Sequence, residues 1–214
     1  MLNGMSLEEL NALYDEKHDP ISMDYDEFFG EMHLTEAQKK KRKKTAEKMQ
    51  EIMEWLLAVV YYYMNDGVYD YMDAIAEAEQ SYKDIVKDTG VSDSFVNNHI
   101  TMAITSVVST MEKNPDNIYN FTNDRARMIA ENEANSIWND AEFEEAVKAG
   151  MTRKTWHTIL DKKTRDWHAE VNGQTRPILE PFDVDGELLL FPRDESLGSS
   201  GGNVVNCRCS VTYS

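Results

Sequence analysis

Hydrophobic positions recur at helical spacing through the first two thirds of the chain. In four stretches an apolar side chain returns every three or four residues, the period of a helix that buries one face. The pattern predicts helices over residues 35–64, 68–88, 93–113 and 122–149. Turn and breaker residues follow them, at Asn65-Asp66-Gly67, Gly90, Asn114-Pro115 and Gly150. Short connections of this kind favour antiparallel helices that bury their apolar faces against one another.

The first 33 residues alternate short apolar groups with acidic residues. Ser6-Leu7-Glu8-Glu9 has the capping-box pattern that begins a short helix, and Asp19-Pro20 is expected to end it. One interpretation is an acidic arm that is solvated and docks loosely. The other is an arm that becomes ordered on a partner, with Tyr25, Phe28 and Phe29 as anchors.

The pattern changes near Thr152, where threonine and aromatic residues begin to alternate. Strands are expected over residues 155–160, 178–182, 187–191 and 204–213, with Asp183-Val184-Asp185-Gly186 as a hairpin turn. Asp161 could cap a short helix between the first two of these strands. The sequence therefore predicts an α+β protein with an acidic arm (1–33), a helical region (34–120) and a small C-terminal α+β domain with an antiparallel sheet (121–214).

Charge is distributed unevenly along the chain. Acidic residues exceed basic ones by 39 to 22, a net charge of −17, so the surface as a whole disfavours nucleic acid. Residues Lys39 to Lys44 are nevertheless six consecutive positive charges. They are interpreted as a solvated helix face, or as a contact with an acidic neighbouring subunit or with packaged DNA.

The helical region holds more aromatic and methionine residues than one narrow buried face can cover. Tyr61-Tyr62-Tyr63-Met64 and Tyr69-Asp70-Tyr71-Met72 flank one predicted turn, and some of these side chains should contact another protein. His99 is expected to be solvated or to cap a helix. Arg125 and Arg127 lie near a helix start, where positive charge opposes the helix dipole, so another interaction should hold them. Glu131 is close enough along the helix to pair with Arg127.

No apolar run approaches the ~20 residues of a membrane span, and no basic-then-apolar segment begins the chain, so a cytoplasmic protein without a membrane partner is expected. In that setting the two cysteines, Cys207 and Cys209, are expected to be thiols or metal ligands. On a strand their side chains would share one face. With His168 and Asp161 they could hold a zinc ion, provided that Asp161 and His168 fold back toward each other. Reduced buried thiols beside a histidine and an arginine, or a strained disulfide, are the alternatives.

These residues also carry a family resemblance. Arg125-Ala126, Ile129-Ala130 and Glu133 lie on one helix, and Gly150, Trp156, Asp161, Arg165, His168, Gly173, Phe191-Pro192 and Asn206-Cys207-Arg208-Cys209 follow in order. The set resembles the minor head protein family of tailed phages, also called the phage Mu protein F-like family, over roughly residues 122–210. Within it, Trp156, Arg165, Arg125, Asn206 and Arg208 are expected to have structural or interaction roles. The family helix usually has Arg-Thr-Glu where this chain has Glu131-Asn132-Glu133.

The resemblance implies a structural component of the virion, present at the head or portal vertex and in the host cytoplasm during assembly. Its partners would be the portal protein, the major capsid protein or further copies of itself, and its role head morphogenesis, DNA packaging or DNA delivery. One alternative is a nucleic-acid-directed enzyme that uses His168, Arg165 and Asp161. A second is a metal-stapled DNA-binding module that uses the lysine run.

Overall fold

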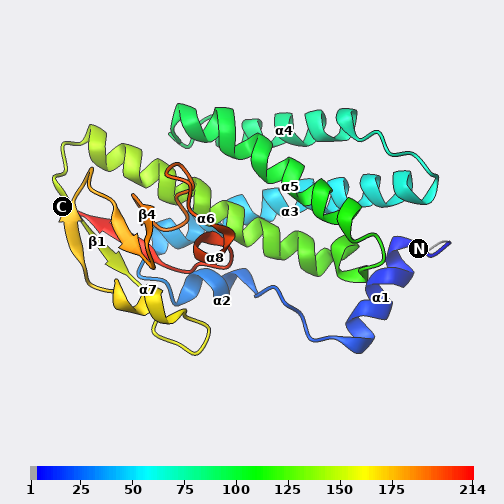
Figure 1. Cartoon of the computed structure of the whole chain (residues 1–214), viewed down its shortest axis with the longest axis horizontal. Coiled ribbons are helices and arrows are strands. Elements are labelled where there is room, and N and C mark those ends of the chain that lie inside the picture. Colours follow the sequence, from blue (N-terminus) through cyan, green and yellow to red (C-terminus); the bar gives the residue numbers. More distant parts are fainter. Residues whose placement is uncertain (1–3) are drawn as a thin grey trace.

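The computed structural model describes residues 4–214 and confirms the α+β class (Figure 1). Two long helices run along the molecule, and the small sheet lies at the end that also holds the C-terminus. The helices are α1 (Leu7–Lys17), α2 (Tyr25–Gly30), α3 (Glu36–Asn65), α4 (Met72–Val86), η1 (Phe95–His99), α5 (Ile100–Lys113), η2 (Ile118–Phe121), α6 (Asn123–Lys148), α7 (Asp166–Glu170) and α8 (Gly201–Val204). The strands are β1 (Arg153–His157), β2 (Thr175–Pro177), β3 (Phe182–Val184), β4 (Glu187–Leu189) and β5 (Ser210–Tyr213).

Helix α3 makes its most extensive packing contact with α6, and α4 and α5 cover the helical core on one side (Figure 1). The predicted capping box at the start of α3 is confirmed: the Thr35 hydroxyl accepts from the Gln38 N–H, and the Gln38 side chain accepts from the Thr35 N–H. Helix α6 begins at the predicted cap, because the Thr122 hydroxyl accepts from the Arg125 N–H. Its first half completes the helical core and its second half reaches the sheet, so α6 joins the two hydrophobic clusters of the protein.

The N-terminal segment packs on the rest of the protein. Its capping box at Ser6 and Glu9 is confirmed. Leu10, Phe28 and Phe29 are almost completely buried within the helical core, so the structure does not show the loosely docked arm. The aromatic anchors proposed for a partner fill the protein's own interior, as their hydrophobic transfer energy favours.

The sheet is smaller and more irregular than the sequence pattern predicted. Strand β1 pairs antiparallel with both β2 and β5, and Trp156 lies opposite Val211 in the register. The predicted hairpin turn is confirmed between β3 and β4, with Asp185 and Gly186 at positive φ. The strand predicted over residues 178–182 is wrong except at its last residue, because β2 ends at Pro177, a turn follows, and β3 begins only at Phe182. The strand predicted over residues 204–213 is wrong in its first half, because Val204 ends α8 and β5 begins only at Ser210. Prolines and glycines around these segments shorten the ladders.

The turn between α3 and α4 exposes several large apolar side chains. Tyr69 is 65% exposed and Met72 70% exposed, and Tyr62, Tyr63 and Val68 are also exposed. We call these five residues the tyrosine tip. Across residues 4–214, no helix combines the length and the apolar character that crossing a membrane requires.

Candidate metal centre

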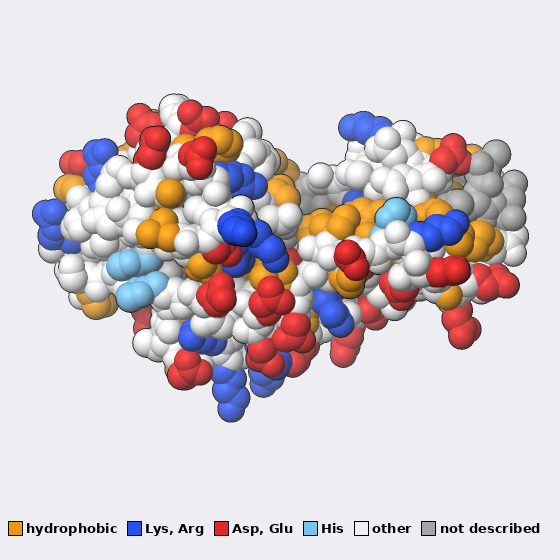
Figure 2. Space-filling view, turned by 90° about the horizontal axis from the view of Figure 1, so that it is seen from below, with side chains coloured by type: hydrophobic (Ala, Val, Ile, Leu, Met, Phe, Trp, Pro, Cys, Tyr) orange, Lys and Arg blue, Asp and Glu red, His pale blue; other side chains and the backbone are white. Residues whose placement is uncertain are grey.

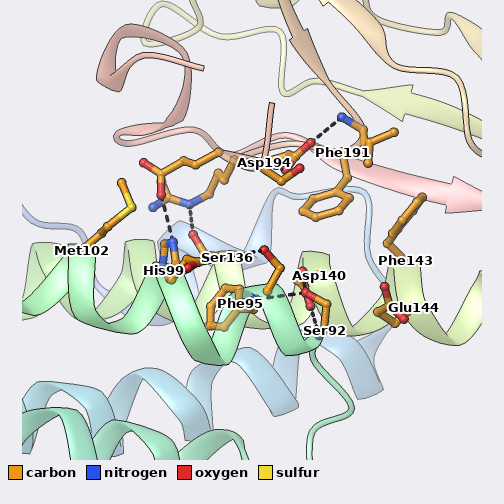
Figure 3. Close-up of a pocket in the computed structure, with 16 residues that line it drawn as sticks. Ser92, Phe95, His99, Met102, Ser136, Asp140, Phe143, Glu144, Phe191 and Asp194 are labelled. Atoms are coloured by element: carbon orange, nitrogen blue, oxygen red, sulfur yellow. Dashed lines mark hydrogen bonds and ion pairs between the residues drawn. The ribbon is translucent and has the colours of Figure 1, made fainter. Parts of the chain in front are cut away.

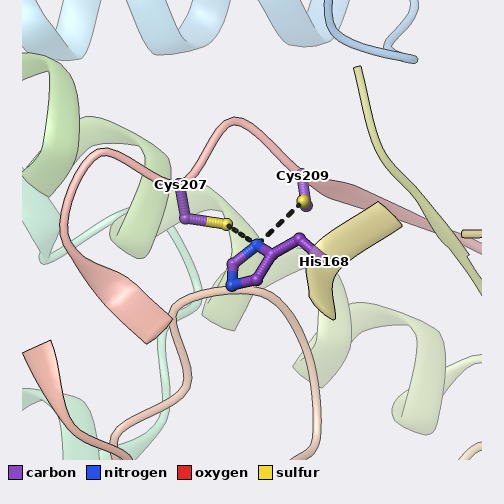
Figure 4. Close-up of side chains that lie close together, drawn as sticks. All are labelled: His168, Cys207 and Cys209. Carbon is purple, nitrogen blue, oxygen red and sulfur yellow. Dashed lines mark hydrogen bonds between the residues drawn. The ribbon is translucent and has the colours of Figure 1, made fainter. Parts of the chain in front are cut away.

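The structure brings His168, Cys207 and Cys209 together from two distant segments. His168 lies on the one-and-a-half-turn helix α7, directly after the β1 strand and its following loop. The two cysteines lie between α8 and β5, where the chain turns at Asn206, whose φ is +54°. They therefore do not occupy a strand, contrary to the sequence interpretation, yet both sulfurs still face the same imidazole (Figure 4).

The three side chains are buried and converge on one point. His168 Nδ1 lies 3.6 Å from the sulfur of Cys207 and 3.4 Å from the sulfur of Cys209. One ligand atom from each residue lies within 4.8 Å of the other two. Each of the three residues is 2% exposed, and both cysteines are free thiols. This is the close grouping that a metal ion needs, and a disulfide between the two cysteines is not formed.

Asn203 fixes the orientation of the histidine ring. Its Oδ1 atom accepts from Trp167 Nε1 at 2.7 Å and lies 3.1 Å from His168 Nε2. Because an indole nitrogen only donates, this side of the Asn203 amide must be the oxygen, and His168 Nε2 must be the donor. The Asn203 amide nitrogen donates in turn to the Val184 carbonyl and to Glu187. The neutral imidazole therefore carries its lone pair on Nδ1, which faces the sulfurs.

The two thiols differ in acidity because they contact each other. The hydrogen bond from Cys209 is the main cause that lowers the pKa of Cys207 well below its usual value. The interaction with Cys207 and burial raise the pKa of Cys209. The group thus favours one thiolate beside a histidine, which is the form that binds soft cations.

Asp161 does not join this group. Its carboxylate forms an ion pair of 2.5 Å with Arg208 and accepts from the Lys163 N–H and the Thr164 hydroxyl. Helix α7 begins five residues later, with Arg165 at its N-cap, so the predicted helix cap at Asp161 is also wrong. The Asp161 carboxylate organises a turn and holds the arginine between the two cysteines.

The other landmark residues have structural contacts. Arg165 donates to the Val205 carbonyl at 2.6 Å, which ties the start of α7 to the segment before the cysteines. Asn206 pairs with Asn132 through two hydrogen bonds of 2.7 and 2.8 Å. Trp156 is fully buried in the core of the sheet domain.

Arg125 has the additional interaction that its place near a helix start required. Its guanidinium donates to the carbonyl and side chain of Asn120 and to the Val107 carbonyl. Glu131 does not form the predicted local pair with Arg127: its carboxylate accepts from the Met23 N–H, and burial raises its pKa to about 8. Both residues thus bind other segments of the chain.

Sequence reasoning missed the polar face of α6 that supports the site. Asn132, Asn135 and Asn139 lie three and four residues apart and are buried. Asn135 donates to the Cys207 carbonyl at 3.1 Å, and Asn139 donates to the Pro192 carbonyl at 2.9 Å. The asparagine spacing was visible in the sequence and is the one signal that could have indicated this face.

The lysine run contains a second missed residue, Arg42, which is fully buried. Its guanidinium binds both oxygens of Glu142, at 2.7 and 2.9 Å, and donates to Asn135 and Asn139. Lys43 pairs with Asp26, and Lys41 lies over the ring of Trp138. The run is therefore not one solvated face, because consecutive helical residues point in different directions.

The space beside the cysteines is small. The cavity lined by Thr158, Arg165, His168 and both cysteines has a volume of about 10 Å³. That is room for about one water molecule. A larger cavity of about 340 Å³ lies between η1, α6 and the segment after β4, and its labelled residues include His99, Asp140 and Asp194 (Figure 3).

His99 in the larger cavity is held on both sides by carboxylates, which corrects the expectation of a solvated or capping histidine. Its ring nitrogens lie 2.8 Å from Glu133 and 2.9 Å from Glu195. Burial by itself lowers the pKa of His99, but the two carboxylates outweigh it and raise the pKa to about 9. A histidine protonated at neutral pH cannot serve as a general base.

The fold and the site together define a helical protein that carries a small, internally braced α+β domain. The profile of the phage Mu protein F like protein family matches residues 94–212, more than half of the chain. The chain belongs to this family. The match begins at residue 94, before the landmark residues that start at about residue 122, and so includes η1 and α5.

One curated relative is the NAD(+)--arginine ADP-ribosyltransferase EFV of Enterococcus faecalis, which is 33% identical over 91 residues. The match covers 41% of this chain but only 18% of that protein. No solved structure matches the chain.

Proposed function

We propose that the protein is a structural minor head protein of a tailed phage that binds the portal or the major capsid protein during head morphogenesis. The observation that carries this proposal is the family match over residues 94–212. The contacts of the landmark residues support it, because Trp156, His168 and Cys207 are buried and the cavity beside His168 has a volume of only about 10 Å³. A role in DNA packaging or delivery, at the same vertex, belongs to the same proposal.

The tyrosine tip is the surface proposed to bind the other head protein. Tyrosine and methionine are enriched in protein interfaces, and an exposed apolar cluster of this kind is unfavourable in water. Beside it, a cavity of about 330 Å³ is lined by residues that include Tyr69, Pro115 and Phe121. The turn between α3 and α4 lies at the opposite end of the molecule from α7 and the sheet (Figure 1), so changes in the tip should leave the candidate metal centre intact.

An enzyme that uses His168, Arg165 and Asp161 is less well supported. All three side chains have intramolecular partners, in Asn203, Val205 and Arg208. A cavity of about 10 Å³ beside them has room for a water molecule but not for a nucleotide. The activity in the name of the enterococcal relative belongs to that protein, and the match covers only 18% of it. The contacts of His168, Arg165 and Asp161 do not assign that activity to this chain.

A contact with packaged DNA through Lys39–Lys44 is also weakened, because Arg42 is buried and Lys43 is paired with Asp26. On the face in Figure 2, basic side chains are scattered among acidic ones. With a net charge of −17, such a surface does not form a phosphate-binding track.

Binding can be tested with the purified chain and the purified portal and major capsid proteins of the same phage. We expect one of the two to bind, and the double variant Tyr69→Ser, Met72→Ser to bind at least 10-fold more weakly. Leu179→Ser is the matched control, because Leu179 is 68% exposed but lies outside the tip. This variant should bind as tightly as the unmodified protein. If neither head protein binds the unmodified chain, the proposal is wrong.

A further inference from the structure

We propose that His168, Cys207 and Cys209 bind one zinc ion, and that a water molecule is its fourth ligand. The site differs from the four-residue site that the sequence suggested, because Asp161 is excluded. This inference is independent of the proposed function, since a zinc ion can stabilise this fold whatever the protein binds.

The distances fit a tetrahedral zinc ion. Zn–S bonds of ~2.3 Å and Zn–N bonds of ~2.0–2.1 Å at tetrahedral angles place sulfur and nitrogen about 3.6 Å apart. The two sulfur–nitrogen distances here are 3.6 and 3.4 Å. Thiolate and imidazole ligands suit zinc and other soft or borderline transition metals, whereas hard cations such as magnesium prefer oxygen.

Simple hydrogen bonding between thiols and histidine does not explain the arrangement equally well. Nδ1 of a neutral imidazole has one lone pair and accepts one hydrogen. Two sulfurs nevertheless lie at nearly equal distances from it. A cation placed among the three atoms uses the lone pair and both sulfurs at once.

The surroundings already have the form of a second coordination shell. The histidine that binds a metal commonly donates its other N–H to an oxygen that fixes the ring. Asn203 has this role, and its own amide is held by Trp167, Val184 and Glu187. Asn135 holds the Cys207 backbone from α6. Both ligand segments are therefore oriented by contacts that do not require the ion.

We assign the fourth coordination position to water for two reasons: the group of close ligand side chains has three members, and the cavity beside it has room for about one water molecule. Among residues 4–214, the group of close metal-binding side chains contains three members and no carboxylate. Asp161 is paired with Arg208 at 2.5 Å. The cavity of about 10 Å³ adjoins all three ligands and is lined by Lys163, Arg165 and Arg208. It has room for about one water molecule, and its positive rim favours a hydroxide or a small anion in the same place.

The ion would join α7 to the segment before β5, in a domain whose two sheets have only three and two strands. Small domains of this kind commonly need a metal or a disulfide for stability. The Cys–His–Cys cluster supplies the metal ligands without a disulfide.

The test uses the whole chain, purified without chelator and analysed for metals. We expect one zinc per chain in the unmodified protein and in Asp161→Asn, and none in the double variant Cys207→Ser, Cys209→Ser. Loss of zinc from a folded Asp161→Asn would show that the aspartate is the fourth ligand. A zinc-free protein that also fails to take up added zinc would overturn the whole proposal.

A second measurement on the unmodified chain avoids dependence on how the variants fold. Cobalt(II) exchanged into the site should give the absorption spectrum of a tetrahedral ion with thiolate ligands. Added azide should change that spectrum, because it replaces an exchangeable water. A tetrahedral spectrum that azide leaves unchanged would contradict the solvent ligand, and an octahedral spectrum would contradict the site.

Discussion

Asn135 on α6 donates a hydrogen bond of 3.1 Å to the carbonyl oxygen of Cys207. The same side chain accepts from Arg42 on α3 at 3.1 Å. These two hydrogen bonds link Arg42 in the helical region, through Asn135 on α6, to Cys207 near the end of the chain. Helix α6 carries the connection, because its buried asparagines contact α3 on one side and the sheet domain on the other.

Removing the arginine of this chain of contacts should destabilise the protein strongly. In Arg42→Ala, Glu142 and two asparagines lose a partner in a buried place, and breaking such a pair typically costs about 3–5 kcal/mol. Chemical denaturation should show a loss of unfolding free energy in that range. Lys40→Ala is the control from the same run: Lys40 is exposed, so the change should stay within about 0.5 kcal/mol. Equal effects of the two variants would contradict the buried role of Arg42.

The stability should depend on pH through His99. Its pKa is raised from 6.5 to about 9 in the folded protein by Glu133 and Glu195, against the effect of burial. Its contribution is therefore fully present below pH 6.5 and is lost as the pH rises through 9. Each pKa unit is worth about 1.4 kcal/mol, so the loss is on the order of 3 kcal/mol.

The control for this prediction is His99→Gln, which keeps polar contacts but cannot titrate. Unfolding free energies of both proteins should be measured between pH 6 and pH 10. Arg193, Tyr82 and other ionisable groups near Glu133 remain in both proteins, so the difference isolates the histidine. If the difference in unfolding free energy between the unmodified protein and His99→Gln does not decrease above pH 7, His99 is not held as a cation.

Lys154 is a buried amine, and we expect its charge to reduce the stability of the folded protein. Its side chain is fully buried, its Nζ has no hydrogen-bond partner among the described residues, and it lies 5.2–5.3 Å from the ring centres of Phe143 and Phe182. Burial lowers the pKa of Lys154 to about 8. Lys154→Met should therefore raise the unfolding free energy by about 1–3 kcal/mol at pH 7.

The same substitution has a characteristic pH dependence. Because the folded pKa of about 8 lies below the ordinary value of 10.5, the folded protein loses this proton first as the pH rises. The cost of the buried charge is complete below pH 8 and declines between pH 8 and pH 10.5. The unfolding free energies of Lys154→Met and of the unmodified protein should be compared at pH 7 and pH 10. The difference between the two proteins should be smaller at pH 10.

If zinc is bound, Asn203 should affect its affinity without being a ligand. Asn203→Ala removes the acceptor of His168 Nε2, and losing such a contact typically weakens metal binding about 10–100-fold. Competition with a chromogenic chelator measures the change. Gln174→Ala is the control, because Gln174 lies in the turn after α7 and its side chain, within residues 4–214, donates only to the Glu170 carbonyl. An unchanged zinc affinity in Asn203→Ala would contradict the role of His168 as a zinc ligand.

The sequence allowed the long helices to be predicted well, because their signals are local. The capping residues Thr35 and Thr122 and the stop at Asn65 lie within a turn of the helix ends. The hairpin at Asp185-Gly186 was equally local, since both residues adopt the positive φ that such a turn needs. The three candidate ligands His168, Cys207 and Cys209 were also recognised, from residue type and family order.

What could not be predicted depends on pairing across long stretches of sequence. Arg42 appears in a run of lysines, and only its position opposite Asn135, Asn139 and Glu142 makes it a core residue. Residue type makes Asp161 a plausible fourth ligand, but its carboxylate is paired with Arg208, 47 residues further along the chain. The spacing of hydrophobic and polar residues along the chain does not show which distant residues pair with each other.

The proposal that the chain is a component of a phage head can be tested most directly by quantitative mass spectrometry of purified phage particles. Peptides of this chain should be present at a constant ratio to the portal protein, in particles that have been washed at high salt and digested with protease outside the head. Their absence from infectious particles, with the protein abundant in the infected cell, would contradict a structural role in the head.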